Sequence, residues 1–126
     1  MKKYKLKTNF KDQRGIIKDI IQEDINSITY ITIKKGKIRG NHYHKKTTQW
    51  NFIINGSVKL FYKKNVFSKT IKKVLLKKND LAVCRPNEPH AFKSLKDCEI
   101  IVFTKGPRKG KEYETDTYRL TSPILK

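Results

Sequence analysis

The sequence predicts an all-β protein folded as an antiparallel double-sheet jelly roll. Apolar and polar residues alternate in short blocks, which is the pattern of strands that bury one face. Turn-forming residues such as Asn, Gly, Pro and Asp separate these blocks. Apolar residues do not repeat with the helical period over any long run. Strand therefore follows strand along the chain, and a double sheet lets each strand bury its apolar face.

Seven blocks carry the alternation, and they cover residues 16–21, 28–33, 50–54, 58–62, 71–76, 81–84 and 100–103. The dipeptide between the third and fourth blocks is Asn55 and Gly56, which favours the turn of a two-residue hairpin. We expect the sharpest hairpin of the protein there. After the last block, residues 105–126 are polar and contain two prolines. This stretch is expected to be a C-terminal extension that wraps the barrel or a partner subunit.

The length of 126 residues leaves room for one domain, residues 1–126, with a single core between two sheets. No run approaches the ~20 apolar residues needed to cross a bilayer. The start of the chain, Met-Lys-Lys-Tyr-Lys-Leu-Lys, lacks the apolar stretch of a signal peptide. We therefore expect a cytoplasmic protein with no membrane partner, in which Cys84 and Cys98 are unbridged thiols.

The formal net charge of +19 raises the question of nucleic-acid binding. The 30 basic residues comprise 25 Lys and 5 Arg, and the lysines occur as dispersed singles and pairs. Dispersed lysine favours a compositional bias, with a smaller share left for an anionic ligand or surface. We expect no nucleic-acid partner, and a basic nucleic-acid-associated module is the weakest alternative. The arginines are better indicators of an anionic ligand than the lysines, because a guanidinium binds phosphate in a fixed geometry.

The three histidines of the chain lie in two segments with the marks of a site. Residues 40–44 read Gly-Asn-His-Tyr-His, so His42 and His44 share one face of an extended strand. His90 ends a second segment, Pro-Asn-Glu-Pro-His at 86–90, in which proline stiffens the approach. A His-x-His pair alone is as often structural as functional. The turn residues and prolines around these segments favour a site assembled from separate strands.

These segments resemble the two sequence motifs of the cupin superfamily. The first cupin motif is His-x-His, an acidic residue and then Gly, and the second is rich in Pro and ends in His. More narrowly, three segments are similar to the sugar-nucleotide 3,4-ketoisomerases and, more distantly, to the deoxysugar 3,5-epimerases. They are Asp-Gln-Arg-Gly at 12–15, Arg-Gly-Asn-His-Tyr-His-Lys-Lys at 39–46 and Tyr-Glu-Thr-Asp-Thr-Tyr-Arg-Leu at 113–120. The resemblance implies a cupin-type jelly-roll barrel that isomerises or epimerises a nucleotide-linked 4-keto-6-deoxyhexose.

Metal-binding cupins generally place a glutamate where this chain has Gln49. A neutral amide adds no charge to a divalent cation, so His42, His44, His90 and Gln49 would form a weakened metal site. The ketoisomerases that the chain resembles carry a glutamine-like polar residue here and need no metal. We therefore expect no metal and no cofactor, and if a metal is bound, these four residues are its candidate ligands.

Moving a carbonyl between neighbouring sugar carbons needs a base, a donor to the enediolate oxygen, and an acid. Imidazole suits both proton transfers, since its unperturbed pKa is ~6.5. By resemblance we assign His42 as the base and His44 as its relay or orienting partner, and the reverse assignment fits the sequence equally. Tyr30 shares a strand face with Ile28 and Thr32, and its phenol is the candidate donor to the enolate. A ring in the core, with its hydroxyl bonded to backbone, is an equally weighted interpretation of Tyr30.

Two arginines lie inside the family-like segments. Arg39, directly before the histidine motif, is a candidate ligand for a diphosphate at the mouth of the barrel. Arg14 is a second candidate, although we favour a salt bridge to Asp12 or a contact with a neighbouring subunit.

The resemblance places two further residues in the pocket, and alternation along the strands places two others outside it. Gln49 and His90 are expected to line the pocket, with His90 at its floor. Tyr43 lies between two inward-facing histidines and Trp50 follows Gln49, so both should point away, into the core or an interface.

The sequence thus predicts a nucleotide-sugar isomerase, with 3,4-ketoisomerisation by histidine acid/base chemistry as the expected reaction. A metal-binding or ligand-sensing cupin without catalysis is the alternative. Small jelly rolls commonly cover an exposed sheet edge with a second copy, so we expect a homodimer. The alternative is a monomer in which lysines on the exposed sheet edges prevent pairing with another chain.

Overall fold

A computed structural model describes residues 2–107 and 115–126, and the described chain consists of strands and connecting loops. The strands are β1 (Lys2–Lys5), β2 (Phe10–Asp12), β3 (Gly15–Ile17), β4 (Ser27–Ile33), β5 (Ile38–Tyr43), β6 (Thr48–Asn55), β7 (Ser57–Tyr62), β8 (Lys72–Lys77), β9 (Asp80–Cys84), β10 (His90–Ser94), β11 (Cys98–Lys105) and β12 (Tyr118–Arg119). Over these residues there is no helix long and apolar enough to cross a membrane.

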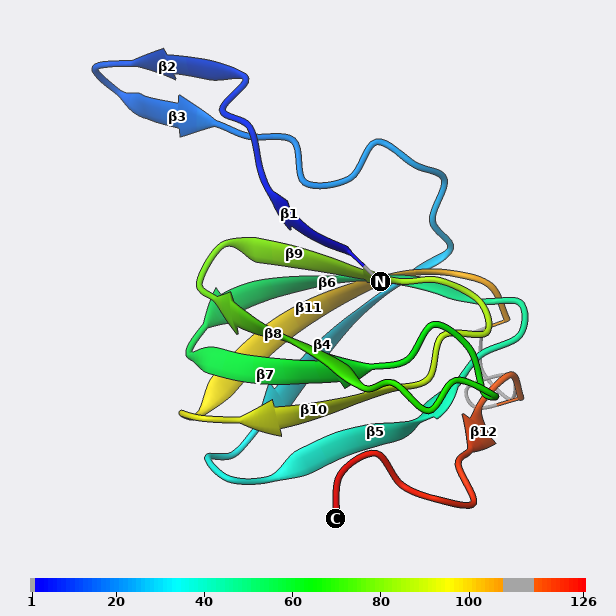
Figure 1. The fold of residues 1–126 in the computed structure, drawn as a ribbon. Helices are drawn as coiled ribbons and strands as arrows, with labels where there is room; N and C mark the ends of the chain where they lie inside the picture. Colours follow the sequence, from blue (N-terminus) through cyan, green and yellow to red (C-terminus); the bar gives the residue numbers. More distant parts are fainter. Residues whose placement is uncertain (1, 108–114) are drawn as a thin grey trace.

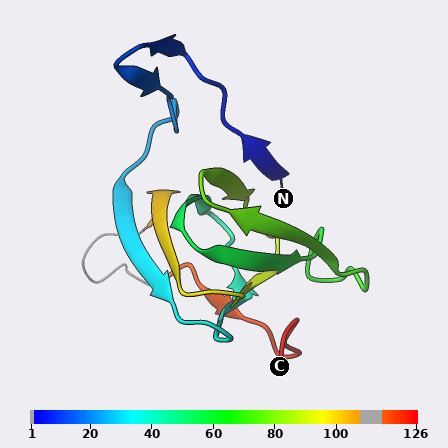
Figure 2. The same ribbon diagram turned by 90° about the vertical axis from the view of Figure 1, so that its left-hand side faces the viewer.

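Ten of the strands form two antiparallel five-stranded sheets that face each other (Figure 1). The first sheet has the order β1-β9-β6-β11-β4, and the second has the order β12-β5-β10-β7-β8. The predicted jelly roll is confirmed. The two sheets are not joined by strand pairing into a closed barrel, so the architecture is an open sandwich whose layers are held together by side chains (Figure 2).

The main core lies between the two sheets and follows the predicted alternation. On β11 every second residue is buried, so Ile100 and Val102 face inward. They pack with residues of the opposite sheet, among which Val58, Leu60 and Leu76 have no exposed surface. Cys84 and Cys98 belong to this core and form no disulfide.

A second apolar cluster covers the outer face of the first sheet. Trp50, Leu81 and Val83 point outward from β6 and β9, and the segment after β3 covers them with Ile20 and Ile21. β6 and β9 are therefore buried on both faces. This burial explains why blocks 50–54 and 81–84 are almost uniformly apolar in sequence. Trp50 points away from the site, as predicted. The block predicted at 16–21 is a strand only to Ile17, because its later part serves as this cover.

The turn at Asn55 and Gly56 is not the predicted hairpin. It carries the chain from β6 in the first sheet to β7 in the second, as a corner of the sandwich. Gly56 has a φ of 86°, and a Cβ there would lie 2.3 Å from the carbonyl oxygen of Asp97. Glycine is needed here because two backbones meet at this corner. The preference of hairpin turns for Asn-Gly does not reveal such a contact.

The described C-terminal residues lie along β5. Strand β12 pairs with β5, and the side chain of Asn41 on β5 accepts hydrogen bonds from the amides of Ile124 and Leu125. Residues 108–114 of the expected extension lie outside the described residues. The β2–β3 hairpin at the other end of the chain stands apart from the sandwich (Figure 1).

We predict that Gly56→Ala lowers the free energy of unfolding by ~3 kcal/mol or more, because it combines a positive φ with a backbone clash. Gly36→Ala is the matched control. Gly36 also has a positive φ of 78°, but nothing lies within 4 Å of a Cβ there. Its cost should be about 1 kcal/mol. Urea unfolding of both variants measures the difference, and equal losses would show that the corner at Gly56 is not tightly packed.

Candidate active site

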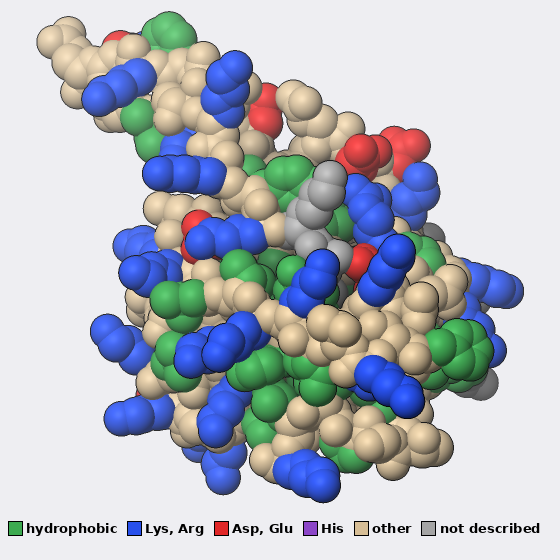
Figure 3. All heavy atoms as spheres, in the orientation of Figure 1, with side chains coloured by type: hydrophobic (Ala, Val, Ile, Leu, Met, Phe, Trp, Pro, Cys, Tyr) green, Lys and Arg blue, Asp and Glu red, His purple; other side chains and the backbone are tan. Residues whose placement is uncertain are grey.

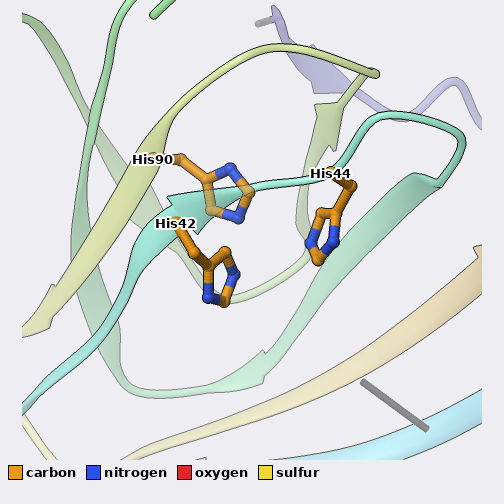
Figure 4. A group of neighbouring side chains, drawn as sticks. All are labelled: His42, His44 and His90. Atoms are coloured by element: carbon orange, nitrogen blue, oxygen red, sulfur yellow. The ribbon is translucent and has the colours of Figure 1, made fainter. Parts of the chain in front are cut away.

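The three histidines of the chain meet between the two sheets (Figure 4). His42 lies near the end of β5, His44 follows that strand, and His90 opens β10. Strands β5 and β10 pair so that His90 lies opposite His42. The ring centroids of His42 lie 4.9 Å from His44 and 4.8 Å from His90. Two segments separated in sequence therefore build one imidazole cluster, which the turn residues and prolines around them favoured.

Close packing of β5 against β10 sets the geometry of this cluster. Gly40 has a φ of 100°, and a Cβ there would lie 2.8 Å from the carbonyl oxygen of His90. The register of the two strands shifts between His90 and Ala91, at the same place. Only glycine lets the backbones approach this closely, so Gly40 positions His42 against His90.

The cluster opens into a pocket of about 300 Å³. Its polar wall contains all the histidines together with Gln49 and Arg39, which the sequence predicted for this place. Its apolar wall contains Ile31, Ile33, Phe92, Ile100 and Val102. A polar cluster facing an apolar wall is typical of a small-molecule site.

Tyr30 does not line this pocket, so neither its candidate role as donor to the enolate nor the alternative of a ring in the core fits its position. Ile31 and Ile33 of β4 face the pocket, while Tyr30 is 57% exposed on the outer surface. Its hydroxyl donates to the Glu99 carboxylate on the neighbouring strand β11. Neither face of β4 is clearly more apolar than the other in sequence, so alternation alone did not decide which face is buried.

Arg14 also lies away from the pocket. It sits in the turn of the β2–β3 hairpin, where its guanidinium bonds the Asp12 carboxylate with an Nη2 to Oδ2 distance of 2.6 Å. These bonds lower the pKa of Asp12. The salt bridge favoured from the sequence is confirmed, and a role for Arg14 in the pocket of its own chain is not.

Sequence reasoning missed four residues of the site. Asn51 lines the pocket two residues after Gln49, so the period of the strand could have revealed it. Thr117 and Arg119 enter the pocket from the C-terminal segment, where Arg119 pairs with His42 across β12 and β5. Asp116 contacts the ring of His44 through its backbone carbonyl. The last three lie inside the family-like segment 113–120, but nothing in their spacing predicted contact with the histidines.

Hydrogen bonds fix the orientation of two imidazoles. Nδ1 of His44 lies 2.9 Å from the carbonyl oxygen of Asp116, and Nδ1 of His90 lies 2.9 Å from that of Glu88. A carbonyl only accepts, so each Nδ1 carries the proton and each Nε2 presents a lone pair. Nε2 of His44 and Nδ1 of His42 are buried without a partner in the protein. Unsatisfied buried nitrogens facing a pocket are groups that a ligand would satisfy.

The Asp116 carboxylate holds the backbone that carries His44. It accepts hydrogen bonds from the amides of Lys45 and Lys46 and from Oγ1 of Thr47, at 3.1, 2.8 and 2.7 Å. Burial opposes ionisation of Asp116, but these bonds outweigh it and lower the pKa of the carboxyl group. The C-terminal segment therefore fixes both the ring of His44 and the turn after it.

Two of the histidines are held in the neutral form. Burial, followed by the neighbouring imidazoles of His90 and His44, lowers the pKa of His42 to about 3. Burial lowers the pKa of His90 to about 4. A neutral imidazole accepts a proton at one nitrogen and donates one from the other, which is the requirement for proton transfer.

The same imidazoles are chemically suited to a metal. One nitrogen of each ring lies within 4.8 Å of the others, whereas ligands about 2.05 Å from a tetrahedral zinc ion would be about 3.3 Å apart. Gln49 lines the same pocket but would add no charge to a divalent cation.

The facing sheets and the histidine-lined pocket define the chain as a cupin-type jelly-roll protein. More particularly, it belongs to the polysaccharide biosynthesis C-terminal domain family, whose sequence profile matches residues 10–118. No protein with a curated functional description matches the chain.

Solved structures of similar fold confirm the resemblance stated from the sequence. A variant of the 3,4-ketoisomerase QdtA from Thermoanaerobacterium thermosaccharolyticum, in complex with TDP-4-keto-6-deoxyglucose, is 26% identical with a TM-score of 0.74, and the match covers 94% of this chain and 86% of that chain. A 3,4-ketoisomerase from Helicobacter canadensis is 20% identical with a TM-score of 0.76, covering 94% and 89%. The dTDP-4-dehydrorhamnose 3,5-epimerase from Sulfolobus tokodaii is 19% identical with a TM-score of 0.68, covering 86% and 70%. At these identities the last two bear on the fold alone.

The lowered pKa of His42 predicts a loss of stability on mild acidification. Between pH ~6.5 and ~3 the unfolded chain binds a proton at this residue that the folded chain excludes, so the free energy of unfolding falls by up to ~1.4 kcal/mol per pH unit for each such histidine. We expect His42→Asn to reduce this slope, as measured by urea unfolding at about pH 7 and about pH 5. Tyr43→Phe, which changes the adjacent outward residue, should keep the wild-type slope. An unchanged slope in His42→Asn would mean that the pKa of His42 is the same in the folded and the unfolded chain.

Proposed function

We propose that this protein isomerises a nucleotide-linked 4-keto-6-deoxyhexose to its 3-keto isomer by histidine acid/base catalysis. The observation that carries the proposal is the convergence of His42, His44 and His90 in one pocket, where one nitrogen of His42 and one of His44 have no partner in the protein. The likeness to a ketoisomerase solved with a 4-keto-6-deoxy sugar nucleotide supports the substrate class.

The reaction is a proton shift with no net redox change. A base removes the proton on C3, which is acidic because C4 is a ketone, and an enediolate forms across C3 and C4. A proton is then delivered to C4, the hydroxyl proton of the C3 oxygen moves to the C4 oxygen, and the C3 oxygen becomes the new carbonyl. Both transfers take place on one small part of the ring, so a compact imidazole cluster is suited to them.

We assign His44 as the base, which reverses the first of the two orders considered from the sequence. Its Nε2 has no partner in the protein, and its Nδ1–H donates to the Asp116 carbonyl. The Asp116 carboxylate also holds the turn after His44, so the ring is kept in one orientation. His42, whose pKa is lowered to about 3, holds a proton poorly and is better suited to pass one on.

Gln49 replaces Tyr30 as the donor to the enediolate. Its amide lines the pocket, whereas Tyr30 is turned outward. Asn51 is less suited, because its amide nitrogen already donates to the carbonyl of Ala82, 3.2 Å away. A neutral amide stabilises a developing oxyanion without drawing a metal into the site. The reaction proposed here needs no metal or cofactor.

Arg39 and Arg119 are the proposed ligands of the nucleotide diphosphate. Both are exposed and line the pocket. Backbone carbonyls steer them, since Nε of Arg39 donates to Thr32 at 3.1 Å and Nη1 of Arg119 donates to Gly40 at 3.2 Å. Two guanidinium groups at the pocket wall match the charge and shape of a diphosphate.

We further propose that the enzyme is a cytoplasmic homodimer. Phe10, Ile16 and Ile17 on the β2–β3 hairpin are more than half exposed, and so are Ile28 and Tyr30 on the edge strand β4. Apolar hairpin residues and an unpaired edge in one chain favour pairing with a second copy. Size-exclusion chromatography with light scattering measures the mass, and a monomer would rule out this part of the proposal.

The histidine roles predict large losses of turnover in two conservative variants. His44→Asn and His42→Asn should each reduce the rate by ~10²–10⁴-fold, because each removes a proton-transfer group. NMR of a dTDP-linked 4-keto-6-deoxyhexose follows the reaction, and circular dichroism checks the fold. The wild type should keep its activity after treatment with a chelator and dialysis.

Near wild-type rates in both histidine variants would reject the acid/base cluster. Activity lost on chelation and restored by a divalent cation would show that the histidines hold a metal. Stoichiometric metal without any turnover would favour the alternative of a binding or sensing cupin.

The arginine roles predict where nucleotide affinity resides. Arg39→Ala and Arg119→Ala should each weaken thymidine diphosphate binding by about ten- to hundredfold, because each removes charge-assisted hydrogen bonds. The double variant Lys72→Ala/Lys73→Ala changes two exposed lysines on β8 and should leave this affinity nearly unchanged. Calorimetric titration at low and high salt separates specific binding by the arginines from attraction by net charge. Equal losses in all variants would mean that only net charge attracts the nucleotide.

A further inference from the structure

The loop between β7 and β8, residues 63–71, presents apolar side chains to solvent. Phe67 is 92% exposed, Ile71 is 49% exposed and Val66 is 40% exposed. No other large apolar side chain of the described residues is as exposed as Phe67. The loop lies outside the histidine pocket, and the proposed isomerase reaction does not use it.

Local hydrogen bonds hold this apolar tip in place. The Asn65 side-chain oxygen accepts from the amides of Phe67 and Ser68, both at 2.9 Å. The Ser68 hydroxyl accepts from the amide of Thr70 at 3.3 Å, and the loop begins where the Lys63 amide donates to Pro89. Phe67 is thus displayed by a built turn, which limits the entropy lost when it is buried against a partner.

The surroundings of this tip are strongly basic. From residue 25 to residue 79 the sequence contains 13 Lys, one Arg and no acidic residue. Five of these lysines flank the tip, at positions 63, 64, 69, 72 and 73. In the space-filling view, Lys and Arg are spread over the whole face shown, and acidic side chains lie mainly in its upper part (Figure 3). The exposed apolar side chains and the flanking lysines therefore lie in the same segment of the chain.

We infer that loop 63–71 docks the protein onto an anionic lipid bilayer. Phe67 and Val66 enter the boundary between headgroups and acyl chains, while the flanking lysines remain at the level of the lipid phosphates. Surface docking needs no spanning segment, so it goes beyond the sequence expectation of no membrane partner without requiring a transmembrane helix.

A lipid surface fits this loop better than a nucleic acid does. The loop has lysines and no arginine, and it offers point charges without the bidentate geometry that reads bases. Its most exposed residues are apolar, and they gain more from a hydrocarbon boundary than from a phosphate backbone. The inference is independent of the isomerase reaction.

Flotation with lipid vesicles tests the inference on the full chain. Wild type should bind vesicles of phosphatidylcholine mixed with phosphatidylglycerol, should bind pure phosphatidylcholine weakly, and should be released by high salt. Phe67→Ser should weaken binding about tenfold. Lys64→Glu/Lys69→Glu should weaken it by about 25-fold or more, at roughly fivefold per lysine.

The matched control is Lys34→Glu/Lys35→Glu, which makes the same charge change at two exposed lysines of the loop between β4 and β5. This variant should lose no more than about twofold. As a second readout, Phe67→Trp should show a blue-shifted emission on binding. The native Trp50 is only 8% exposed, so its emission should change little.

Three results would overturn the inference. One is no preference for anionic vesicles. Another is an equal loss in both charge-reversal variants, which would show attraction by net charge alone. The third is tighter binding to duplex DNA than to vesicles with no effect of Phe67→Ser, which would assign the basic surface to nucleic acid. All the loop variants should retain wild-type turnover, so a failure here is distinguishable from a failure of the isomerase proposal.

Discussion

The site depends on how closely the backbones of β5 and β10 approach each other. Gly40 permits a distance that any side chain would prevent, and the resulting register places His42 opposite His90. The rest of the pocket is arranged around that contact. β6 contributes Gln49 from the facing sheet, and the C-terminal segment bonds to the other edge of β5. A single close approach between two strands thus determines where the chemistry occurs.

The environments of His42 and His44 differ although their side chains are identical. His42 is buried beside other imidazoles, which disfavour a positive charge on its ring. His44 is hydrogen-bonded through Nδ1 to the carbonyl of Asp116, whose carboxylate also holds the turn after His44. The sequence distance between His44 and Asp116 means that the histidine motif alone does not reveal this difference.

Features that depend on period and composition could be predicted from the sequence, and features that depend on distant backbone contacts could not. The strand character of most of the chain and the shared face of His42 and His44 follow from alternation with a period of two. Tyr30 was misplaced because both faces of β4 carry apolar residues, so the pattern did not identify the buried one. Gly56 was misread because a hairpin turn and a corner between sheets use the same residue type. Asp116 and Arg119 reach the pocket only through pairing of β12 with β5.

The bond between His44 and Asp116 joins residues 72 positions apart. Contacts of such long sequence separation form late, because they close a large loop of chain. Pairing of β4 with β11 and of β1 with β9 spans similar separations, so the first sheet and the orientation of the His44 ring meet the same cost of loop closure. In a refolding chain, β-sheet and activity would therefore recover together, and an interval between them would report a separate docking of the C-terminal segment on β5.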